Sequence, residues 1–148
     1  MLRFGLRFLS AATSLCLIVG CQTQGVLIKE TPLNLSESRR IIASIIGQPK
    51  MMSQNGREMK SRFYDRRGRY LENIENAKER LYTVVTVLGD RRPYDVKVEV
   101  FVEEKVEENV YVISEQDNRS AERIAARIKD ALYQSQSNRN VIDDFRPL

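Results

Sequence analysis

The stretch YDVKVEVFVEE, residues 94–104, decides the fold of this chain. Valine occupies every second position from Val96 to Val102, and charged residues fill most of the positions between them. Because successive side chains of a β-strand point to opposite faces, this alternation predicts a strand with one apolar and one polar face. The apolar face needs a cover, which other parts of the chain have to supply.

Two neighbouring stretches predict strands that pair with this one. Residues 81–88, LYTVVTVL, are apolar or β-branched throughout, which is typical of a central strand. Residues 109–114, NVYVIS, predict another strand, and GDRRP at 89–93 has the composition of a turn. We therefore expect an antiparallel meander of about three to four strands, to which residues 26–28 could add a short edge strand.

Two amphipathic helices can cover the valine face. SESRRIIASIIGQP, residues 36–49, predicts a helix with Ser36 as a candidate N-cap and with Gly47 and Pro49 at its end. A second helix begins at Asp117 or Asn118, and its Arg123, Arg127 and Lys129 are expected to face water. The expected fold class is therefore α+β, with two layers and both helices on one face of the sheet. The apolar positions at helical spacing are Ile41, Ile42, Ile45 and Ile46 in the first helix and Ala121, Ile124, Ala125, Ile128, Ala131 and Leu132 in the second.

Segments without periodicity set the expected domain boundaries. Residues 21–34 predict a tether, residues 35–134 a small α+β domain, and residues 135–148 a flexible C-terminal tail. Inside the domain, residues 50–61 are polar, a turn is expected at 65–68, and residues 74–80 predict one or two helical turns.

The N-terminus has the three parts of a secretory signal peptide. MLRFGLR, residues 1–7, is basic, and FLSAATSLCLIV, residues 8–19, is apolar or small. This apolar run is too short to cross a hydrocarbon core of ~30 Å as a permanent helix. We therefore expect residues 1–20 to be removed.

The end of this leader, Ile18-Val19-Gly20-Cys21, resembles the lipobox of bacterial lipoproteins. The resemblance implies cleavage between Gly20 and Cys21, a diacylglyceryl group on the Cys21 thiol and acylation, for example by palmitate, of the new amino terminus. Two or three acyl chains anchor a protein firmly, because each buried methylene contributes about 0.8 kcal/mol. The alternative is an ordinary signal peptide with a chance cysteine. No family is identified for the remainder of the chain.

A lipid anchor would place the protein in the bacterial cell envelope. Gln22 follows the cysteine, whereas an aspartate at this position favours retention at the inner membrane in well-studied two-membrane bacteria. By this analogy we expect the outer membrane, with the domain facing the periplasm, rather than the inner membrane.

The composition argues against catalysis. The chain contains no histidine and two cysteines, of which Cys16 lies inside the leader. The commonest general base is therefore missing, and Cys21 alone cannot form a zinc site or an intrachain disulfide. We expect no enzyme activity, no catalytic residues, no metal and no cofactor. The net charge is +4 and falls to about +2 without Arg3 and Arg7, so nucleic-acid binding is not indicated either.

One segment is strongly basic and interleaved with aromatic residues. This composition is used for anionic lipid, for polyanionic glycan and for protein interfaces. The alternative is a solvated loop whose arginines pair with Glu58, Asp65 and Glu72. Arg91 and Arg92 could extend the surface or simply finish a hairpin. The candidate residues for binding an anionic partner are Arg57, Lys60, Arg62, Arg66, Arg67 and Arg69.

Acidic groups are interpreted more plainly. The glutamates around residues 99–108 lack the spacing of a calcium loop and are expected to be a solvated strand face. VIDDFRPL, residues 141–148, could be a short docking peptide or a disordered end.

These observations lead to two functional hypotheses. The first is a non-enzymatic envelope lipoprotein with an accessory or scaffold role, which binds a periplasmic or outer-membrane protein assembly. The second is a module that binds anionic lipid or glycan through the arginine-rich segment 57–69. The sequence does not indicate an oligomeric state.

Overall fold

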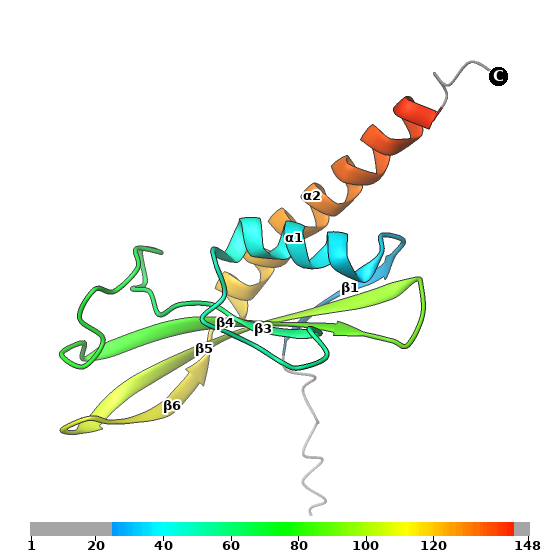
Figure 1. Cartoon of the computed structure of the whole chain (residues 1–148). Coiled ribbons are helices and arrows are strands. Elements are labelled where there is room, and N and C mark those ends of the chain that lie inside the picture. Colours follow the sequence, from blue (N-terminus) through cyan, green and yellow to red (C-terminus); the bar gives the residue numbers. More distant parts are fainter. Residues whose placement is uncertain (1–24, 144–148) are drawn as a thin grey trace, which may run out of the picture.

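The fold is an antiparallel sheet of six strands with two helices packed against one of its faces (Figure 1). It is seen in a computed structural model that describes residues 25–143. The expected α+β class, with both helices on one face, is confirmed. The elements are β1 (Val26–Thr31), α1 (Leu35–Ile46), β2 (Met51–Met52), β3 (Glu58–Lys60), β4 (Glu79–Leu88), β5 (Tyr94–Glu107), β6 (Val110–Gln116) and α2 (Asn118–Asp143).

The strand order is β1-β5-β4-β3-β2, with β6 also paired to β5. The long strand β5 pairs with β4 along one edge, while β1 and β6 share its other edge, β1 beside Val96 and Val98 and β6 beside residues 101–107. The three predicted strands correspond to β4, β5 and β6. The expected total was too low, because β2 and β3 are too short to show a periodic pattern.

The core lies between the valine face and the helices. Val85 of β4 is the Cα partner of Val98 of β5, and Val87 is the partner of Val96. This face packs against Ile42 of α1 and other apolar residues of both helices. The fully buried positions include Ile42, Met59, Val85, Val96, Val98, Val100, Val102, Ala121 and Ile128.

The expected tether of residues 21–34 is wrong for residues 26–31. These residues form β1, in which Ile28 and Thr31 are buried. The short strand that the sequence left open at 26–28 is therefore present and longer. Its formation has a physical reason, since the edge of β5 beside Val96 and Val98 would otherwise expose backbone groups that need partners.

The start of α1 differs from the expected one, whereas the start of α2 does not. Asn34, not Ser36, is the N-cap of α1, because its side-chain oxygen accepts a hydrogen bond from the Glu37 amide. Asp117 caps α2 in the same way, as predicted, by accepting from the Ser120 amide.

The expected flexible tail from residue 135 is wrong as far as Asp143, where α2 ends. This part of α2 extends beyond the sheet (Figure 1), so it needs no apolar stripe and the sequence shows none. The Ser135 hydroxyl donates to the Glu37 carboxylate at 2.7 Å and ties the helix to α1. Residues 144–148 lie outside the described residues, so the candidate docking peptide is not described as a whole.

The segment between α1 and β4 is organised by the sheet. Residues 50–61 form the β2–β3 hairpin, and the predicted turn at 65–68 is present, with Tyr64 bridged to Tyr70. The helical turns expected at 74–80 are absent from the described chain. Instead the segment is held by Tyr111, whose hydroxyl lies 2.7 Å from the Ala77 carbonyl oxygen and 2.8 Å from that of Ile74.

Within residues 25–143, neither helix combines the length and the apolar character needed to cross a membrane.

Candidate functional site

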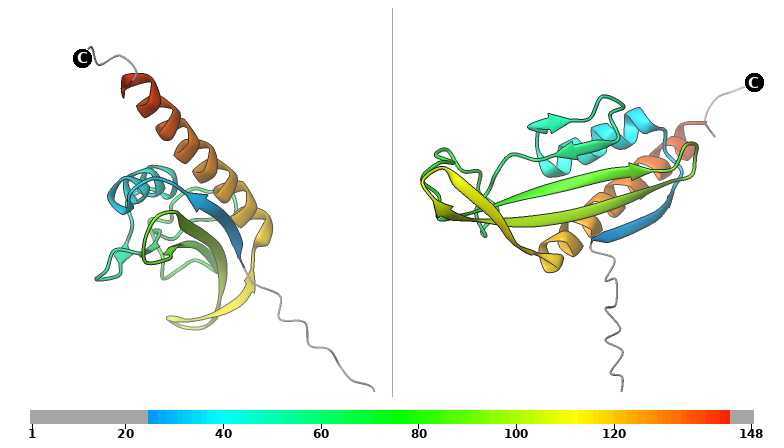
Figure 2. Two further views of the ribbon diagram at one scale, coloured as in Figure 1. Left: turned by 90° about the vertical axis from the view of Figure 1, so that its right-hand side faces the viewer. Right: turned by 90° about the horizontal axis from the view of Figure 1, so that it is seen from below.

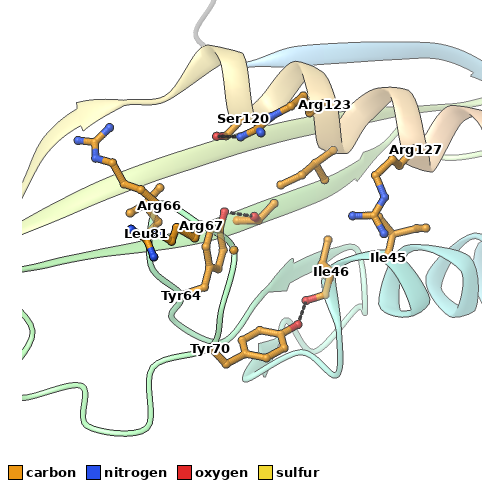
Figure 3. A pocket seen from close by; sticks show the side chains of 13 residues that line it. Ile45, Ile46, Tyr64, Arg66, Arg67, Tyr70, Leu81, Ser120, Arg123 and Arg127 are labelled. Atoms are coloured by element: carbon orange, nitrogen blue, oxygen red, sulfur yellow. Dashed lines mark hydrogen bonds between the residues drawn. The ribbon is translucent and has the colours of Figure 1, made fainter.

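A cavity lies between the C-terminal end of α1, the first half of α2 and the loop of residues 64–70 (Figure 3). Its volume is about 510 Å³. Its floor is apolar and consists of Ile45 and Ile46 of α1, Leu81 of β4 and Ile124 of α2. The other lining residues are Tyr64, Arg66, Arg67, Gly68, Tyr70, Thr83, Ser120, Arg123 and Arg127.

Four of the lining residues are arginines, and no aspartate or glutamate is among the described lining residues. Arg66 and Arg67 come from the loop, and Arg123 and Arg127 are one turn apart on α2. The cavity therefore collects cations from segments that are more than fifty residues apart in the sequence.

Arg66 is already neutralised by carboxylates. It makes a two-point contact with Glu79, with nitrogen–oxygen distances of 2.7 and 2.8 Å, and a further contact of 2.9 Å with Glu115. These hydrogen bonds raise the pKa of Arg66 above its ordinary value. Figure 3 shows Arg66 at the opposite end of the cavity from Arg127, so it forms a rim fixed to β4 and β6.

The remaining arginines are less compensated. Within the part of the chain that the structure describes, neither Arg67 nor Arg127 has a carboxylate within ion-pair distance. Arg123 donates to the Ser120 hydroxyl oxygen at 2.8 Å. Burial alone would raise the pKa of Asp117, but hydrogen bonds from Ser120 and the charges of Arg66 and Arg123 outweigh it and lower the pKa.

The loop that presents Arg67 is held by Asp65. One Asp65 carboxylate oxygen accepts from the backbone amides of Arg67 and Arg69, both at 2.9 Å, and the other oxygen pairs with the Arg69 guanidinium. These contacts, led by the Arg69 amide, lower the pKa of Asp65. Asp65 therefore stays ionised and keeps the turn closed at neutral pH.

Two tyrosines complete the wall. The Tyr64 hydroxyl lies 2.7 Å from the Thr83 hydroxyl, and burial raises the pKa of Tyr64. The Tyr70 hydroxyl donates to the Ile46 carbonyl oxygen at 2.9 Å, so the loop is attached directly to the end of α1. Both contacts are drawn in Figure 3.

The six cations predicted as one basic surface are divided by the fold. Only Arg66 and Arg67 line the cavity. Arg69 pairs with Asp65. The alternative interpretation, a solvated loop, predicts that Asp65 pairs with an arginine of this segment. Arg62 lies 5.1 Å from the centre of the Tyr70 ring, and the Arg57 guanidinium contacts the Gly89 carbonyl oxygen.

Lys60 lies on the other face of the sheet, 3.5 Å from the centre of the Tyr82 ring. Desolvation by burial lowers its pKa. On the same face, Arg80 is 3.5 Å from the centre of the Tyr111 ring and pairs with Glu103 at 2.6 Å. Because the charges of Arg80 and Glu103 already satisfy each other, this cluster is a second, minor core rather than an open binding site.

Sequence reasoning assigned Arg123 and Arg127 to solvent. A signal was nevertheless present, since an i,i+4 pair of arginines marks one side of a helix as basic. What the sequence could not supply was the loop that faces this side.

The described part of the chain contains no group of three or more histidine, cysteine, aspartate or glutamate residues placed to hold a metal ion. Gly20 and Cys21, the predicted cleavage and lipidation residues, lie outside the described residues.

The second distinctive surface is the β5–β6 ribbon, residues 103–116. Four aliphatic side chains are exposed on it, with exposed fractions of 55% for Val106, 45% for Val110, 46% for Val112 and 56% for Ile113. Among the described strands, β6 pairs only with β5, so its outer edge is free. Figures 1 and 2 show the tip of this ribbon extending away from the helices.

No protein-family model matches the chain, and no curated protein or solved structure is significantly similar to it.

Proposed function

We propose that this chain is a non-enzymatic, lipid-anchored protein of the bacterial cell envelope, which faces the periplasm from the outer membrane. There it binds a partner protein in an accessory or scaffold role. The lipobox-like Ile18-Val19-Gly20-Cys21 supports the anchor. The observation that carries the binding role is the exposed apolar surface of the β5–β6 ribbon.

The ribbon has two properties of a protein interface. Its exposed aliphatic side chains are close together in the hairpin and lie on both of its faces, since Val112 and Ile113 are successive residues of β6. Clustered exposed apolar residues mark interaction sites more often than scattered ones do. Its outer edge has backbone amide and carbonyl groups that an added strand can pair with. Both properties favour an extended segment of a partner protein as the occupant.

Charge narrows the chemistry of this partner. Glu104, Glu107, Glu108 and Glu115 are exposed or half-exposed around the apolar side chains, and Lys105 is the one basic residue of the ribbon. An extended segment in which apolar residues alternate with lysine or arginine would match this surface. An acidic segment would be repelled.

The start of β1 at Val26 limits the distance between the proposed anchor and the domain. Four residues separate Cys21 from Val26, so the chain between their Cα atoms has five steps and spans at most ~17 Å. The domain would therefore stay close to the membrane surface, which favours a partner that is itself embedded in the outer membrane or bound to it.

Photocrosslinking in cells tests this proposal. A photoreactive amino acid at Val112 should give a crosslinked protein of defined mass, whereas the same amino acid at Arg91, on the far turn of the sheet, should not. Adding Ile113→Asp should abolish the product, because a charge in the apolar surface opposes docking. Leu88→Asp is the matched control, since Leu88 is another exposed aliphatic residue, 39% exposed and outside the ribbon.

Two results would contradict the proposal. One is the same crosslinked species from positions 112 and 91, which would indicate random collisions. The other is a product at position 112 that persists with Ile113→Asp, which would mean that the apolar ribbon surface is not the contact.

The second hypothesis, an anionic lipid- or glycan-binding surface over residues 57–69, has narrower support. Only Arg66 and Arg67 of its six cations meet further cations, namely Arg123 and Arg127 in the cavity. Salt-sensitive association with anionic envelope polymers, lost when Arg66, Arg67 and Arg69 become Ala, would favour it.

A further inference from the structure

We propose that the arginine-lined cavity binds an amphiphilic phosphate, that is, a phosphate monoester carried on an apolar body. The phosphate would pair with one of the two guanidinium groups that lack a carboxylate partner, Arg67 or Arg127, which lie at opposite ends of the cavity (Figure 3). The apolar body would lie over Ile45, Ile46 and Ile124. This site is separate from the β5–β6 ribbon, so the inference does not depend on the docking of a partner protein.

The positive charge of the cavity favours an anion as its ligand. Arg67 and Arg127 lack a carboxylate partner among the described residues, and the described lining contains no acid to compensate them. A cleft lined by one sign of charge concentrates counter-ions of the other sign. The guanidinium group matches phosphate and carboxylate oxygens with two parallel hydrogen bonds, and phosphate offers more acceptor oxygens to several arginines at once.

The loop contacts that hold Arg67 leave its guanidinium group available. Asp65 holds the backbone of Arg67, not its side chain. Arg66 and Arg123 are occupied by Glu79 and Ser120 respectively, and so they frame the site. An anion bound to Arg67 or to Arg127 would therefore not compete with an existing ion pair of that guanidinium group.

The size and the floor of the cavity call for an apolar body as well. A volume of about 510 Å³ lies within the range of about 300–1,000 Å³ that is typical of small-molecule sites. An inorganic phosphate would occupy a small part of it and leave the isoleucine floor in contact with water. An alkyl or acyl group attached to the phosphate removes this apolar surface from water.

Two sources could supply this chemistry, a lipid of the bilayer or a soluble phosphate ester. Val26 packs on the small cluster of Leu81, Val100, Val102 and Ala121, which Tyr64 and Ile124 of the cavity also contact. If Cys21 carries the proposed anchor, at most ~17 Å of chain separates the membrane from this cluster. This step favours a lipid source and rests on the anchor, whereas the binding chemistry itself does not.

Calorimetric titration of the full chain, purified in a nonionic detergent at fixed ionic strength, tests the binding. Hexyl phosphate is the probe, hexanol tests the apolar body alone, and inorganic phosphate tests the charge alone. Titration into detergent without protein gives the background. We expect hexyl phosphate to bind at least about tenfold more tightly than either reference compound, because it satisfies both parts of the site.

Two double variants distinguish binding in the cavity from general electrostatic attraction to the protein. Arg67→Gln with Arg127→Gln should weaken the binding of hexyl phosphate at least about tenfold, since both guanidinium groups that are available to the phosphate are lost. Arg91→Gln with Arg92→Gln removes the same charge from an exposed turn outside the cavity and should leave the affinity within about twofold. Equal losses in both double variants, or equal affinity for hexyl phosphate, hexanol and inorganic phosphate, would overturn the proposal.

Vesicles identify the source of the phosphate. The full chain with Cys21→Ser is added to zwitterionic vesicles with and without a phosphomonoester lipid, so that no acyl anchor contributes. Binding that needs this lipid and is lost with Arg67→Gln and Arg127→Gln indicates a bilayer source. Binding of hexyl phosphate without vesicle binding indicates a soluble ester. Failure of both probes would overturn the inference and leave the proposed anchor and ribbon untouched.

Discussion

The hydroxyl of Tyr70 donates a hydrogen bond of 2.9 Å to the carbonyl oxygen of Ile46, the last residue of α1. The last carbonyls of a helix have no partner inside the helix, so this side chain supplies one of them from a loop 24 residues further along the chain. The contact closes one end of the arginine-lined cavity and couples the stability of α1 to the position of the loop.

Tyr70→Phe removes this hydrogen bond and keeps the ring. We expect a loss of about 1 kcal/mol in the free energy of unfolding, since the Ile46 carbonyl loses its partner, and urea denaturation measures it. Tyr133→Phe is the matched control, because Tyr133 is 50% exposed on α2 and its hydroxyl makes no hydrogen bond to a described residue. Equal stability of both variants would show that the Tyr70 contact is not formed in solution.

The Arg80–Glu103 pair, on the face of the sheet opposite the helices, tests how much a buried charge without its partner lowers the stability. Its side chains are 17% and 13% exposed, so Glu103→Gln leaves a guanidinium charge that is largely buried without a carboxylate. We expect a loss of about 2–4 kcal/mol in urea denaturation.

Replacing both members controls for this prediction. Arg80→Met with Glu103→Leu removes the guanidinium group together with its carboxylate, so it should recover most of the stability. A double variant as unstable as Glu103→Gln would mean that the loss comes from packing rather than from the charge.

The lowered pKa of Asp117 predicts a pH dependence of stability. Its pKa in the folded chain lies below the ordinary value of 3.8, so its contribution is present above pH 3.8 and is lost as the pH falls through the folded pKa. Asp117→Asn keeps a good N-cap for α2 but removes the charge. The stability difference between the wild type and this variant should therefore be larger at pH 6 than at pH 2.5, as measured by urea denaturation. A difference that does not change with pH would contradict the assignment.

Much of the fold could be predicted from the sequence because apolar residues recur in it with the regular period of a strand or a helix. The valine alternation of β5 and the isoleucine stripe of α1 each encode a face that must be buried. The errors fall where this signal is absent. Residues 133, 134, 137 and 138 of α2 are exposed, and β1 is ordered by pairing with β5 rather than by its own pattern.

The cavity could be predicted only in part. The sequence identified Arg66 and Arg67 as candidates, but it also grouped them with Lys60, which the alternation of strand faces carries to the opposite side of the sheet. It could not place Arg127 and Arg67 in the same cavity, because this depends on how a loop and a helix sixty residues apart pack. Periodicity predicts faces within an element, not which irregular segment a face meets.

The proposed anchor predicts different behaviour for the two cysteines. Cys21→Ser should abolish labelling by radioactive palmitate and release the protein from the membrane fraction, because the acylated thiol is lost. Cys16→Ser should change neither result, since residue 16 lies in the part that is expected to be cleaved. Palmitate labelling that survives Cys21→Ser, or that is lost equally in both variants, would contradict the lipobox assignment.

Gly47 gives a final test of the wall of the cavity. It follows α1 with a φ of 78°, and a Cβ atom there would lie 2.0 Å from the Tyr70 hydroxyl oxygen. Gly47→Ala should therefore cost the backbone strain of a positive φ, about 1–2 kcal/mol, and in addition push Tyr70 away from Ile46. Urea denaturation gives the total, and hexyl phosphate titration shows whether the cavity has changed.

Gly68→Ala separates these two effects. Gly68 lies in the same wall with a φ of 80°, but nothing is within 4 Å of the Cβ that would be added. It should show the strain without the collision, and so a smaller loss of stability and an unchanged affinity. Removing the ring with Tyr70→Ala should make Gly47→Ala less damaging than it is in the wild type, because the added methyl group then has no Tyr70 ring to collide with. If the losses from Gly47→Ala and Tyr70→Ala simply add, Gly47 is required for the helix end alone and the position of Tyr70 does not depend on it.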